Sequence, residues 1–307
     1  MSRWKGIKTI EYGTDCEDNL VIGLGFFDCL HIGHIKLIGE CKRLANKYAC
    51  KSAIFTFENS PFVVLNKDVK QVLDFEERLF KLNELQVDYC IKARFDKEFS
   101  QLEPEKFLNG FVKNKKVKAL VAGNDYTFGK NGAGGVDFLK KWCDKEGIEL
   151  SLIEFATDNG IKISSTSVRK LLSEGNLKKA NEYLGGHYFV IGKVEKGRKE
   201  GKNIGFATAN LIYPDEKIRI KEGVYYTRVF VDGVWYKAVT NVGNHPTFDD
   251  YNFNIESHIL YYDNVLYGKK IVVKFIEYIR DIIKFSSKEE LAAQIAKDVK
   301  FALESKE

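Results

Sequence analysis

The sequence predicts two domains: a doubly wound α/β domain built on a parallel sheet, then an antiparallel β-barrel that closes with a C-terminal helix. Three observations support this prediction. The chain has 307 residues, which is long for a single hydrophobic core. Apolar runs alternate with helical patterns up to about residue 184. After Tyr188, short segments rich in Val, Ile, Tyr and Phe follow one another, separated by polar or glycine-rich turns.

The first half alternates strand-like runs with helical patterns. Strands are expected at residues 20–27, 51–57, 87–92, 117–122 and 149–155. Helices are expected near residues 35–48, 74–86, 104–115 and 135–146. In the first helix the apolar residues recur at steps of three and four, with charged residues between them. This order predicts a parallel sheet, and such sheets bind ligands outside the carboxyl ends of their strands.

The second half has the pattern of an antiparallel barrel. Strands are expected at residues 188–194, 224–231, 234–243, 255–262 and 270–278. Asp232-Gly233, between two of these runs, predicts a tight hairpin. A final helix is expected from about Ser287, which can form a capping box with Glu290.

The boundary between the two patterns falls at a pair of glycines. Gly185-Gly186 is the expected hinge, so the domains are predicted at residues 1–184 and 187–307. The chain has no internal repeat or low-complexity tract.

Composition is that of an ordinary globular protein, with 44% hydrophobic and 30% charged residues. The net charge of +5 comes from scattered lysines, which suit a polyanionic small molecule such as ATP, so no nucleic-acid partner is expected. Six cysteines without a C-x-x-C pair favour reduced thiols and a cytoplasmic location. The N-terminus has no apolar signal core and no run approaches membrane-spanning length, so no membrane association is expected.

The segment from Gly25 to His34 is the most informative for function. It follows the first predicted strand and precedes the first predicted helix, which places His31, Gly33 and His34 at a helix entrance. Backbone N–H groups at a helix N-terminus are unpaired and carry partial positive charge, so they bind phosphate. The two imidazoles can donate hydrogen bonds to phosphate oxygens in a transition state. The segment resembles the H-x-G-H signature of the nucleotidyltransferase superfamily and indicates an enzyme that splits ATP.

Two other interpretations of this segment remain open. The histidines could be ordinary surface residues. Together with Asp28 and Cys29 they could also ligate zinc, although no second Cys or His pair occurs elsewhere at ligand spacing.

Three further segments of the first half are expected near the same edge of the sheet. Thr56–Pro61 ends the second strand, Ala122–Gly129 follows the fourth, and Ile163–Arg169 places Ser and Thr at a helix start ahead of an Arg. Taken singly, each is explained by a turn or by helix capping.

The second half carries its own ordered series of motifs. They are Gly192–Val194, Gly197–Gly201, Gly205–Asn210, Gly223–Tyr225, Asn241–Phe248 and Ile255–His258. Taken singly, a Thr-x-Asn turn or a strand glutamate has no specific meaning. Together and in order, the motifs of both halves closely resemble the bacterial bifunctional riboflavin kinase/FAD synthetase family over nearly the whole chain.

The resemblance implies an FMN adenylyltransferase in the first domain. His31, His34 and Arg169 are then the catalytic residues, and Phe57, Asn59 and Pro61 border the flavin. The implied ATP-binding residues are Gly25, Phe26, Asp28, Gly33, Asn124, Asp125, Ser165 and Thr166.

The resemblance implies a riboflavin kinase in the second domain. Thr208 and Asn210 would hold Mg²⁺ and ATP phosphates through hard oxygen atoms. Glu256 would accept the proton of the riboflavin 5′-hydroxyl. Further implied ATP-binding residues are Gly197, Gly201 and Gly205. The implied substrates and products are ATP, riboflavin, FMN and FAD.

Four positions depart from the family pattern. Cys29 stands where glycine is usual, Asn59 where proline is common, Ala207 where the family has proline, and His245 where arginine is common. A side chain at Cys29 makes a left-handed conformation there unfavourable. Two alternative functions stay open: a single-activity adenylyltransferase with a decayed kinase barrel, and a flavin-binding sensor without turnover.

Overall fold

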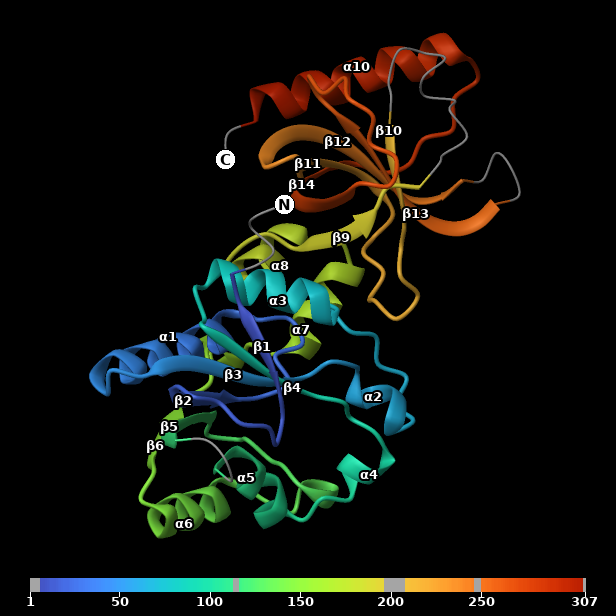
Figure 1. Ribbon diagram of the computed structural model, residues 1–307. Helices are drawn as coiled ribbons and strands as arrows, with labels where there is room; N and C mark the ends of the chain where they lie inside the picture. The colour runs from blue at the N-terminus through green and yellow to red at the C-terminus, as the bar shows by residue number, and fades with distance from the viewer. Residues whose placement is uncertain (1–5, 113–115, 196–207, 246–249, 306–307) are drawn as a thin grey trace. The chain divides into compact units, whose positions relative to one another are not determined.

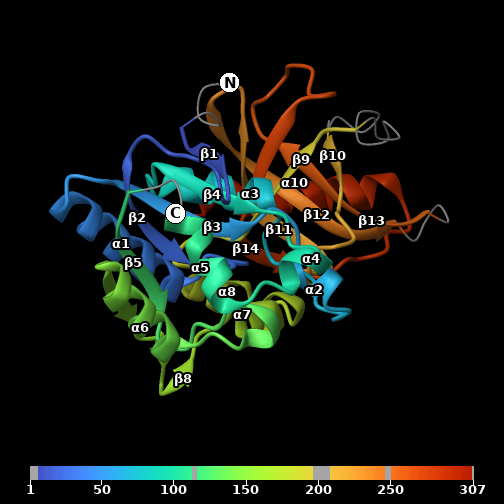
Figure 2. The same ribbon diagram turned by 60° about the horizontal axis from the view of Figure 1, so that its bottom comes forward.

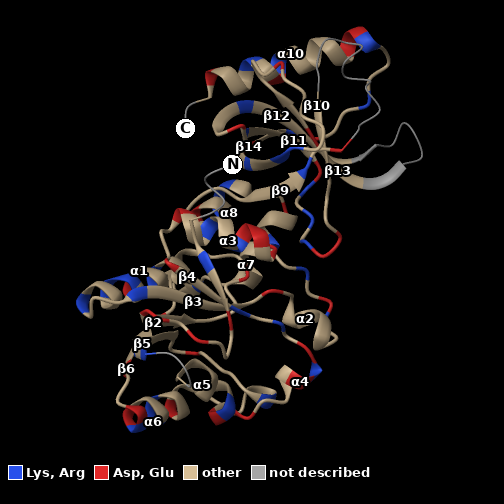
Figure 3. Ribbon diagram, viewed as in Figure 1, with Lys and Arg blue, Asp and Glu red and all other residues tan. Residues whose placement is uncertain are grey.

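The computed structural model describes residues 6–112, 116–195, 208–245 and 250–305, with only the backbone described at residues 244, 245 and 250–252. The chain divides into two compact units, residues 2–165 and 166–307 (Figure 1). Within the described residues, no helix is both long and apolar enough to cross a membrane. Acidic and basic residues are interspersed along helices such as α6 (Val136–Glu146) and α10 (Lys288–Glu304) (Figure 3).

The first unit contains a six-stranded, wholly parallel sheet, which confirms the predicted doubly wound fold. Its strands are β1 (Lys8–Glu11), β2 (Asn19–Leu24), β3 (Lys51–Phe57), β4 (Tyr89–Ala93), β5 (Lys116–Gly123) and β6 (Glu149–Ile153). The strand order is β1-β4-β3-β2-β5-β6, so the winding reverses between β2 and β5. The carboxyl ends of these two strands flank the switch point, where doubly wound sheets bind their ligands.

Helices cover both faces of this sheet (Figure 1). They are α1 (Ile32–Lys47), α2 (Pro61–Val64), α3 (Phe75–Glu84), α4 (Lys97–Ser100), α5 (Pro104–Val112) and α6, with a 3₁₀ turn at Lys130–Gly132. On one face, α1 buries Leu37, Ile38, Cys41 and Leu44. On the other, α5 and α6 contribute Phe107, Phe111, Leu139 and Trp142 to the core cluster. A short hairpin, β7 (Thr157–Asp158) and β8 (Ile161–Lys162), stands out from the sheet (Figure 2).

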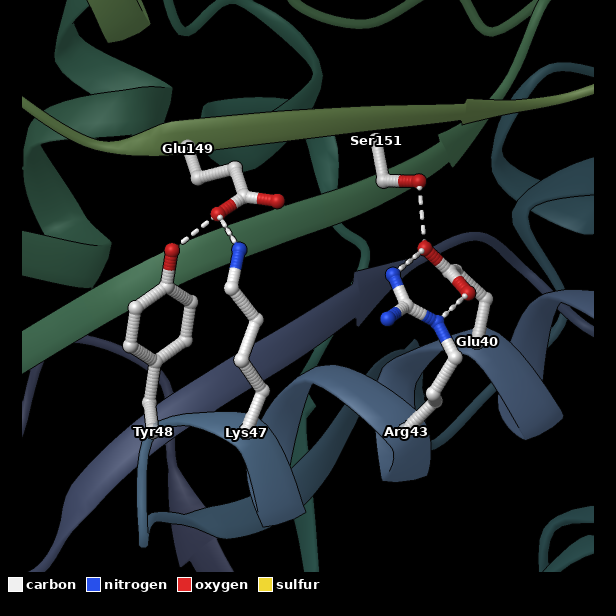
Figure 4. A network of polar contacts seen from close by, with 6 residues as sticks. All are labelled: Glu40, Arg43, Lys47, Tyr48, Glu149 and Ser151. Carbon is white, nitrogen blue, oxygen red and sulfur yellow. Dashed lines mark hydrogen bonds and ion pairs between the residues drawn. The ribbon is translucent and has the colours of Figure 1, made fainter.

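Polar contacts fasten α1 to the edge strand β6 (Figure 4). Glu40 accepts a hydrogen bond from the Ser151 hydroxyl at 2.9 Å. At the C-terminal end of the helix, Lys47 pairs with Glu149 at 2.8 Å and the Tyr48 hydroxyl donates to the same carboxylate. These contacts join the sheet edge to the helix whose N-terminus carries the histidine pair.

The second unit is a six-stranded antiparallel barrel that is nearly closed, as predicted. Its strands are β9 (Phe189–Lys193), β10 (Thr208–Ile212), β11 (Gly223–Val231), β12 (Val234–His245), β13 (Asp250–Ile259) and β14 (Lys270–Arg280), in the order β10-β13-β12-β11-β14-β9. The edges meet where the Glu195 N–H donates to the Asn210 carbonyl at 2.9 Å. The predicted hairpin has φ of 51° at Asp232 and 89° at Gly233, the two positive values of a type I′ turn.

Two helices at the end of the predicted first domain fall almost wholly in the barrel unit, from Thr166 onward. They are α7 (Ser165–Ser173) and α8 (Leu177–Leu184). The Asn181 amide donates to the Phe275 carbonyl of β14 at 3.0 Å, and its oxygen accepts the Tyr188 N–H at 2.8 Å. The Lys221 N–H donates to the Leu172 carbonyl at 3.2 Å. The compact units therefore divide after Ser165, ahead of the Gly185-Gly186 pair.

The C-terminal helix α10 packs on β11 and β12, and its N-terminus is capped by Ser287 (Figure 1). The Ser287 hydroxyl accepts the Glu290 N–H at 3.1 Å. The Glu290 carboxylate accepts the N–H of Ser286, at 3.0 Å, one residue before the cap. The predicted capping box is therefore only half right, because the glutamate reaches back one residue further than that motif requires.

We expect Asp298→Ala to lower the free energy of unfolding of the barrel unit by about 3 kcal/mol, which is the lower end of the range for removing one partner of a buried ion pair. Asp298 is 2% exposed and accepts from Arg280 Nε at 3.1 Å and from an Arg280 terminal nitrogen at 2.7 Å. Its removal leaves a largely buried guanidinium without its carboxylate. Urea unfolding measures the effect. Lys300→Ala, which removes an exposed pair on the same helix, is the control and should cost about 1 kcal/mol or less. Equal losses in both variants would contradict this role.

Candidate functional site

The loop after β2 holds bulky residues in strained backbone conformations. Phe27 has φ of 56° and Leu30 has φ of 50°, and both side chains are buried. Left-handed conformations of such residues cost about 1–3 kcal/mol each and concentrate at functional sites. Cys29 itself has no positive φ, as expected from its side chain. A Cβ on Gly25 would lie 2.9 Å from the Phe27 ring, so this position requires glycine.

His31 is the N-cap of α1. Its Nδ1 accepts the backbone N–H of His34 at 3.3 Å, and α1 begins at Ile32, three residues before the predicted start. Histidine is not a favoured N-cap, so propensity alone could not locate this helix start. The capped terminus brings both imidazoles to the carboxyl end of β2, as the motif predicts.

The two imidazole rings are packed against each other. Their centroids lie 3.8 Å apart with 12° between the planes, and the Phe27 ring meets His34 edge-on at 5.0 Å. A Cβ on Gly33 would lie 3.1 Å from Cε1 of His31. Glycine therefore lets the backbone pass close to the His31 ring.

Both histidines are neutral at pH 7 in the absence of ligand. Burial, with a smaller contribution from nearby Lys162, lowers the pKa of His31 to about 4, against the opposing effects of a backbone hydrogen bond and of Asp125. Burial and the neighbouring His31 hold the pKa of His34 well below its usual value. Because Nδ1 of His31 accepts a hydrogen bond, its proton lies on Nε2, which can donate to a phosphate oxygen.

Exposed polar residues follow β5. Asn124 and Asp125 are exposed, and the Asn124 N–H donates to the Ile153 carbonyl at 3.0 Å. Asp125 forms an ion pair with Lys162 of β8. Lys162 was not among the predicted site residues, although it is a cation close enough to His31 to affect its pKa.

The predicted second phosphate-binding helix begins at Ser165, the first residue of α7. Ser165 is the last residue of the first unit, and its hydroxyl contacts Cys29 Sγ at 3.4 Å, so Ser165 lies beside the loop after β2. Thr166 is exposed in the first turn, and Arg169 is half-buried one turn further along the same helix. The predicted helix start is thus confirmed.

Phe57 and Asn59 lie where β3 ends, as expected for residues near a ligand. The Phe57 ring packs in an aromatic cluster, with its centroid 4.9 Å from that of Phe95 and 5.3 Å from that of Phe99. The Asn59 amide donates to the Phe95 carbonyl and accepts the Phe95 N–H, both at 2.8 Å. Asparagine, which replaces a common proline here, therefore clamps the loop after β4. Pro61 is buried as the first residue of α2.

Arg78 of α3 is a site residue that sequence reasoning missed. Its side chain is fully buried, and its guanidinium donates to the Phe26 carbonyl at 3.1 Å, Thr56 Oγ1 at 2.6 Å and the Phe57 carbonyl at 2.8 Å. Burial lowers its pKa to about 10, opposed by Asp28, so it stays charged at pH 7. One cation therefore joins the ends of β2 and β3.

Two predicted ATP-binding residues lie close to this cation. The Arg78 guanidinium lies 4.8 Å from the half-buried Phe26 ring. Asp28 is buried, and its carboxylate accepts the Val72 N–H at 3.2 Å. These contacts tie the loop after β2 to the segment that leads into α3.

Two of the predicted kinase residues lie directly opposite each other on neighbouring strands of the barrel. Asn210 of β10 faces Glu256 of β13, and Glu256 faces Asn241 of β12. Side chains alternate along strands, so these three lie on one face, while neighbours such as Ser257 and Ala209 are buried. Asn241 lies in a recognised motif but was not among the predicted residues.

Thr208 completes this polar row. The Asn210 amide donates to Thr208 Oγ1 at 3.4 Å, and Thr208 itself faces His258. Hydroxyl and amide oxygens are the donors that Mg²⁺ prefers, so the pair fits the ion that the resemblance implies. The remaining predicted and departing positions, Gly197, Gly201, Gly205, Ala207 and the His245 side chain, lie outside the described residues.

The interpretation of the histidine motif as a zinc site also has a geometric basis. Cys29, His31 and His34 each offer a ligand atom, and these three atoms lie within 4.8 Å of one another.

Comparison with known proteins identifies the family. Residues 14–167 match the FAD synthetase family model and residues 184–306 match the riboflavin kinase model. The bifunctional riboflavin kinase/FMN adenylyltransferase of Listeria monocytogenes is 36% identical over 91% of this chain and 90% of its own length. The chain belongs to this bifunctional family. Family members from Bacillus subtilis and Escherichia coli K12 are 33% and 32% identical, each over 92% of this chain and 91% of their own lengths.

A solved structure from Streptococcus pneumoniae has a fold similar to that of this chain. Its TM-score is 0.85 at 30% identity, with 98% of this chain and all of that chain covered. That protein is described as a macrolide-efflux protein, whereas the family models and the curated relatives name flavin enzymes. It supports the fold alone.

Proposed function

We propose that this chain makes FMN from riboflavin and ATP in its barrel, and FAD from FMN and a second ATP in its α/β unit. The observation that carries the proposal is that each half of the chain gathers its own reactive residues. His31 and His34 meet at the N-terminus of α1, and Asn210 and Glu256 face each other across two strands. Family membership supports both activities.

In the adenylyltransferase, a phosphate oxygen of FMN attacks the α-phosphorus of ATP and pyrophosphate leaves. No covalent enzyme intermediate is needed, so positioning and electrostatic stabilisation supply the catalysis. Neutral His31 and His34 donate hydrogen bonds to phosphate oxygens as charge develops there. Ser165, Thr166 and Arg169 bind the triphosphate at the start of a second helix.

The remaining predicted residues of this unit bind the two substrates. Asn124 and Asp125 lie beside the nucleotide. Phe57 and Asn59 border the flavin, whose planar ring system suits the aromatic cluster around Phe57.

In the kinase, the riboflavin 5′-hydroxyl attacks the γ-phosphorus of ATP, and ADP leaves. Glu256 accepts the hydroxyl proton as the new O–P bond forms. Thr208 and Asn210 hold Mg²⁺ and the ATP phosphates. When bound, Mg²⁺ offsets the negative charge of the phosphates.

We also propose a cytoplasmic location. All six cysteines are unpaired in the structure, and four of them are buried in the first unit. Structural disulfides are rare in that compartment, so a chain without them suits it.

We expect Arg78→Lys to lower the kcat/KM of FAD formation from FMN by about 10–100-fold, because the loops after β2 and β3 shift relative to each other. Lysine keeps the charge but cannot reach three separate acceptors with one nitrogen. Riboflavin phosphorylation should be unchanged. Arg43→Lys, which alters an exposed pair on α1, is the control and should leave both rates unchanged. An unaltered kcat/KM in a folded Arg78→Lys protein would contradict the role of Arg78 in joining the loops.

One incubation tests the proposed function. Purified protein is mixed with riboflavin, ATP and Mg²⁺, and FMN and FAD are followed by chromatography. We expect FMN to form first and FAD to follow. Formation of FAD from added FMN but none from riboflavin would show a decayed kinase. Flavin binding without any turnover would show a sensor.

A further inference from the structure

We propose that Cys29, His31 and His34 form an inhibitory binding site for a thiolate-binding divalent cation such as Zn²⁺. The cation would occupy the histidines that the adenylyltransferase uses for phosphate. Binding rests on the geometry alone, whereas inhibition rests on the proposed function.

The distances allow such a site with small movements. The three ligand atoms lie within 4.8 Å of one another. A cation equidistant from three atoms at that separation lies about 2.8 Å from each, against about 2.3 Å for Zn–S and 2.0–2.1 Å for Zn–N bonds. Each ligand atom would therefore move toward the cation by at most about 0.8 Å.

A second observation points to a ligand. Nδ1 of His34 is buried and has no hydrogen-bond partner in the described part of the chain. Buried polar atoms are nearly always paired, so an orphaned one at a cluster of metal-ligating groups calls for an explanation. The Cys29 side chain is 1% exposed, so its sulfur would bind the cation in a shielded position.

Binding opposes the ligand-free arrangement of the histidines, which is why it would inhibit. The rings are stacked with 12° between their planes, so each must turn to aim a lone pair at a shared cation. His31 must also release or rearrange its long cap bond to the His34 N–H, 3.3 Å in the ligand-free protein. Both changes remove the imidazoles from the positions expected to serve ATP.

Cys29 supplies the third ligand of the site. A residue without a ligating side chain at position 29 would leave only the two imidazoles. Thiolate and imidazole select zinc-like cations, whereas Mg²⁺ prefers oxygen, so the Mg²⁺ needed for catalysis would not compete.

The direct test is a Co²⁺ titration of the full-length protein, kept reduced and free of nucleotide. Cobalt replaces zinc as a spectroscopic probe, and a thiolate ligand gives a charge-transfer absorption band in the near ultraviolet. We expect one equivalent of Co²⁺ to develop this band in the wild type. Cys29→Ser should abolish it, and Cys50→Ser, which alters a half-buried cysteine of the same unit, should retain it.

The second arm measures inhibition at buffered free Zn²⁺. We expect FAD formation from FMN to be inhibited in the wild type at a Zn²⁺ concentration at least tenfold lower than in Cys29→Gly. Circular dichroism checks that Cys29→Ser and Cys29→Gly are folded. If only one of them folds, that variant is used in the Co²⁺ titration.

Absence of the band in the wild type, or its persistence in a folded Cys29 variant, would overturn the site. Equal zinc sensitivity of the wild type and Cys29→Gly would overturn the inhibitory role. If the band behaves as expected but the protein makes no FAD, the proposed function fails while the metal site stands.

Discussion

Replacing Glu256 with glutamine should lower riboflavin phosphorylation by about 10²–10⁴-fold, the usual cost of losing a general base. Glutamine keeps the shape of the side chain and its place opposite Asn210 and Asn241. It cannot accept the proton of the riboflavin hydroxyl at neutral pH. Conversion of added FMN to FAD should be unchanged, because that reaction uses the α/β unit.

Initial rates of FMN formation at saturating Mg²⁺ and ATP measure this effect. Glu277→Gln is the matched control, since Glu277 is an exposed glutamate on β14 of the same barrel. It should retain full kinase activity. If Glu256→Gln phosphorylates riboflavin at the wild-type rate, Glu256 is an ordinary strand residue and the base lies elsewhere.

Replacing His34 with alanine should lower FAD formation from FMN by about 10²–10³-fold, the cost of one transition-state hydrogen-bond donor. The backbone N–H of residue 34 remains, so the cap on α1 can still form through His31. The loss should therefore fall mainly on kcat. Riboflavin phosphorylation should be unchanged.

His187→Ala is the control for this variant, because His187 is an exposed histidine of the barrel unit. Steady-state kinetics with FMN and ATP separate kcat from KM. Loss of both activities in a folded His34→Ala protein would show that the two reactions share one site.

The buried elements of both units could be predicted from the sequence. Strands such as β3 and β5 carry continuous apolar runs, and α1 has a clear helical period. Strand β1 could not be predicted, because Ile10 is its only apolar residue and the strand lies at the edge of the sheet. Strand β10 was also not predicted, because it is only five residues long and overlaps a motif interpreted as a ligand loop.

The histidine pair at a helix N-terminus could also be predicted, because a glycine and two histidines followed a buried strand. The role of Arg78 could not be predicted from the sequence. In sequence it follows Glu76 and Glu77, as on a solvated helix face, and only the fold shows that its side chain is fully buried between the ends of two strands. Long-range hydrogen bonds of this kind have no local sequence signal.

The central claim is that one chain holds two separate sites joined only by FMN as a shared intermediate. A mixing experiment tests it most directly: Glu256→Gln and His34→Ala are each incubated with riboflavin, ATP and Mg²⁺, alone and together, and FAD is measured. The account predicts very little FAD from either variant alone, accumulation of FMN with His34→Ala, and FAD formation from the mixture as FMN passes through solution. A mixture that makes no more FAD than the sum of the separate variants, although both proteins are folded, would contradict it.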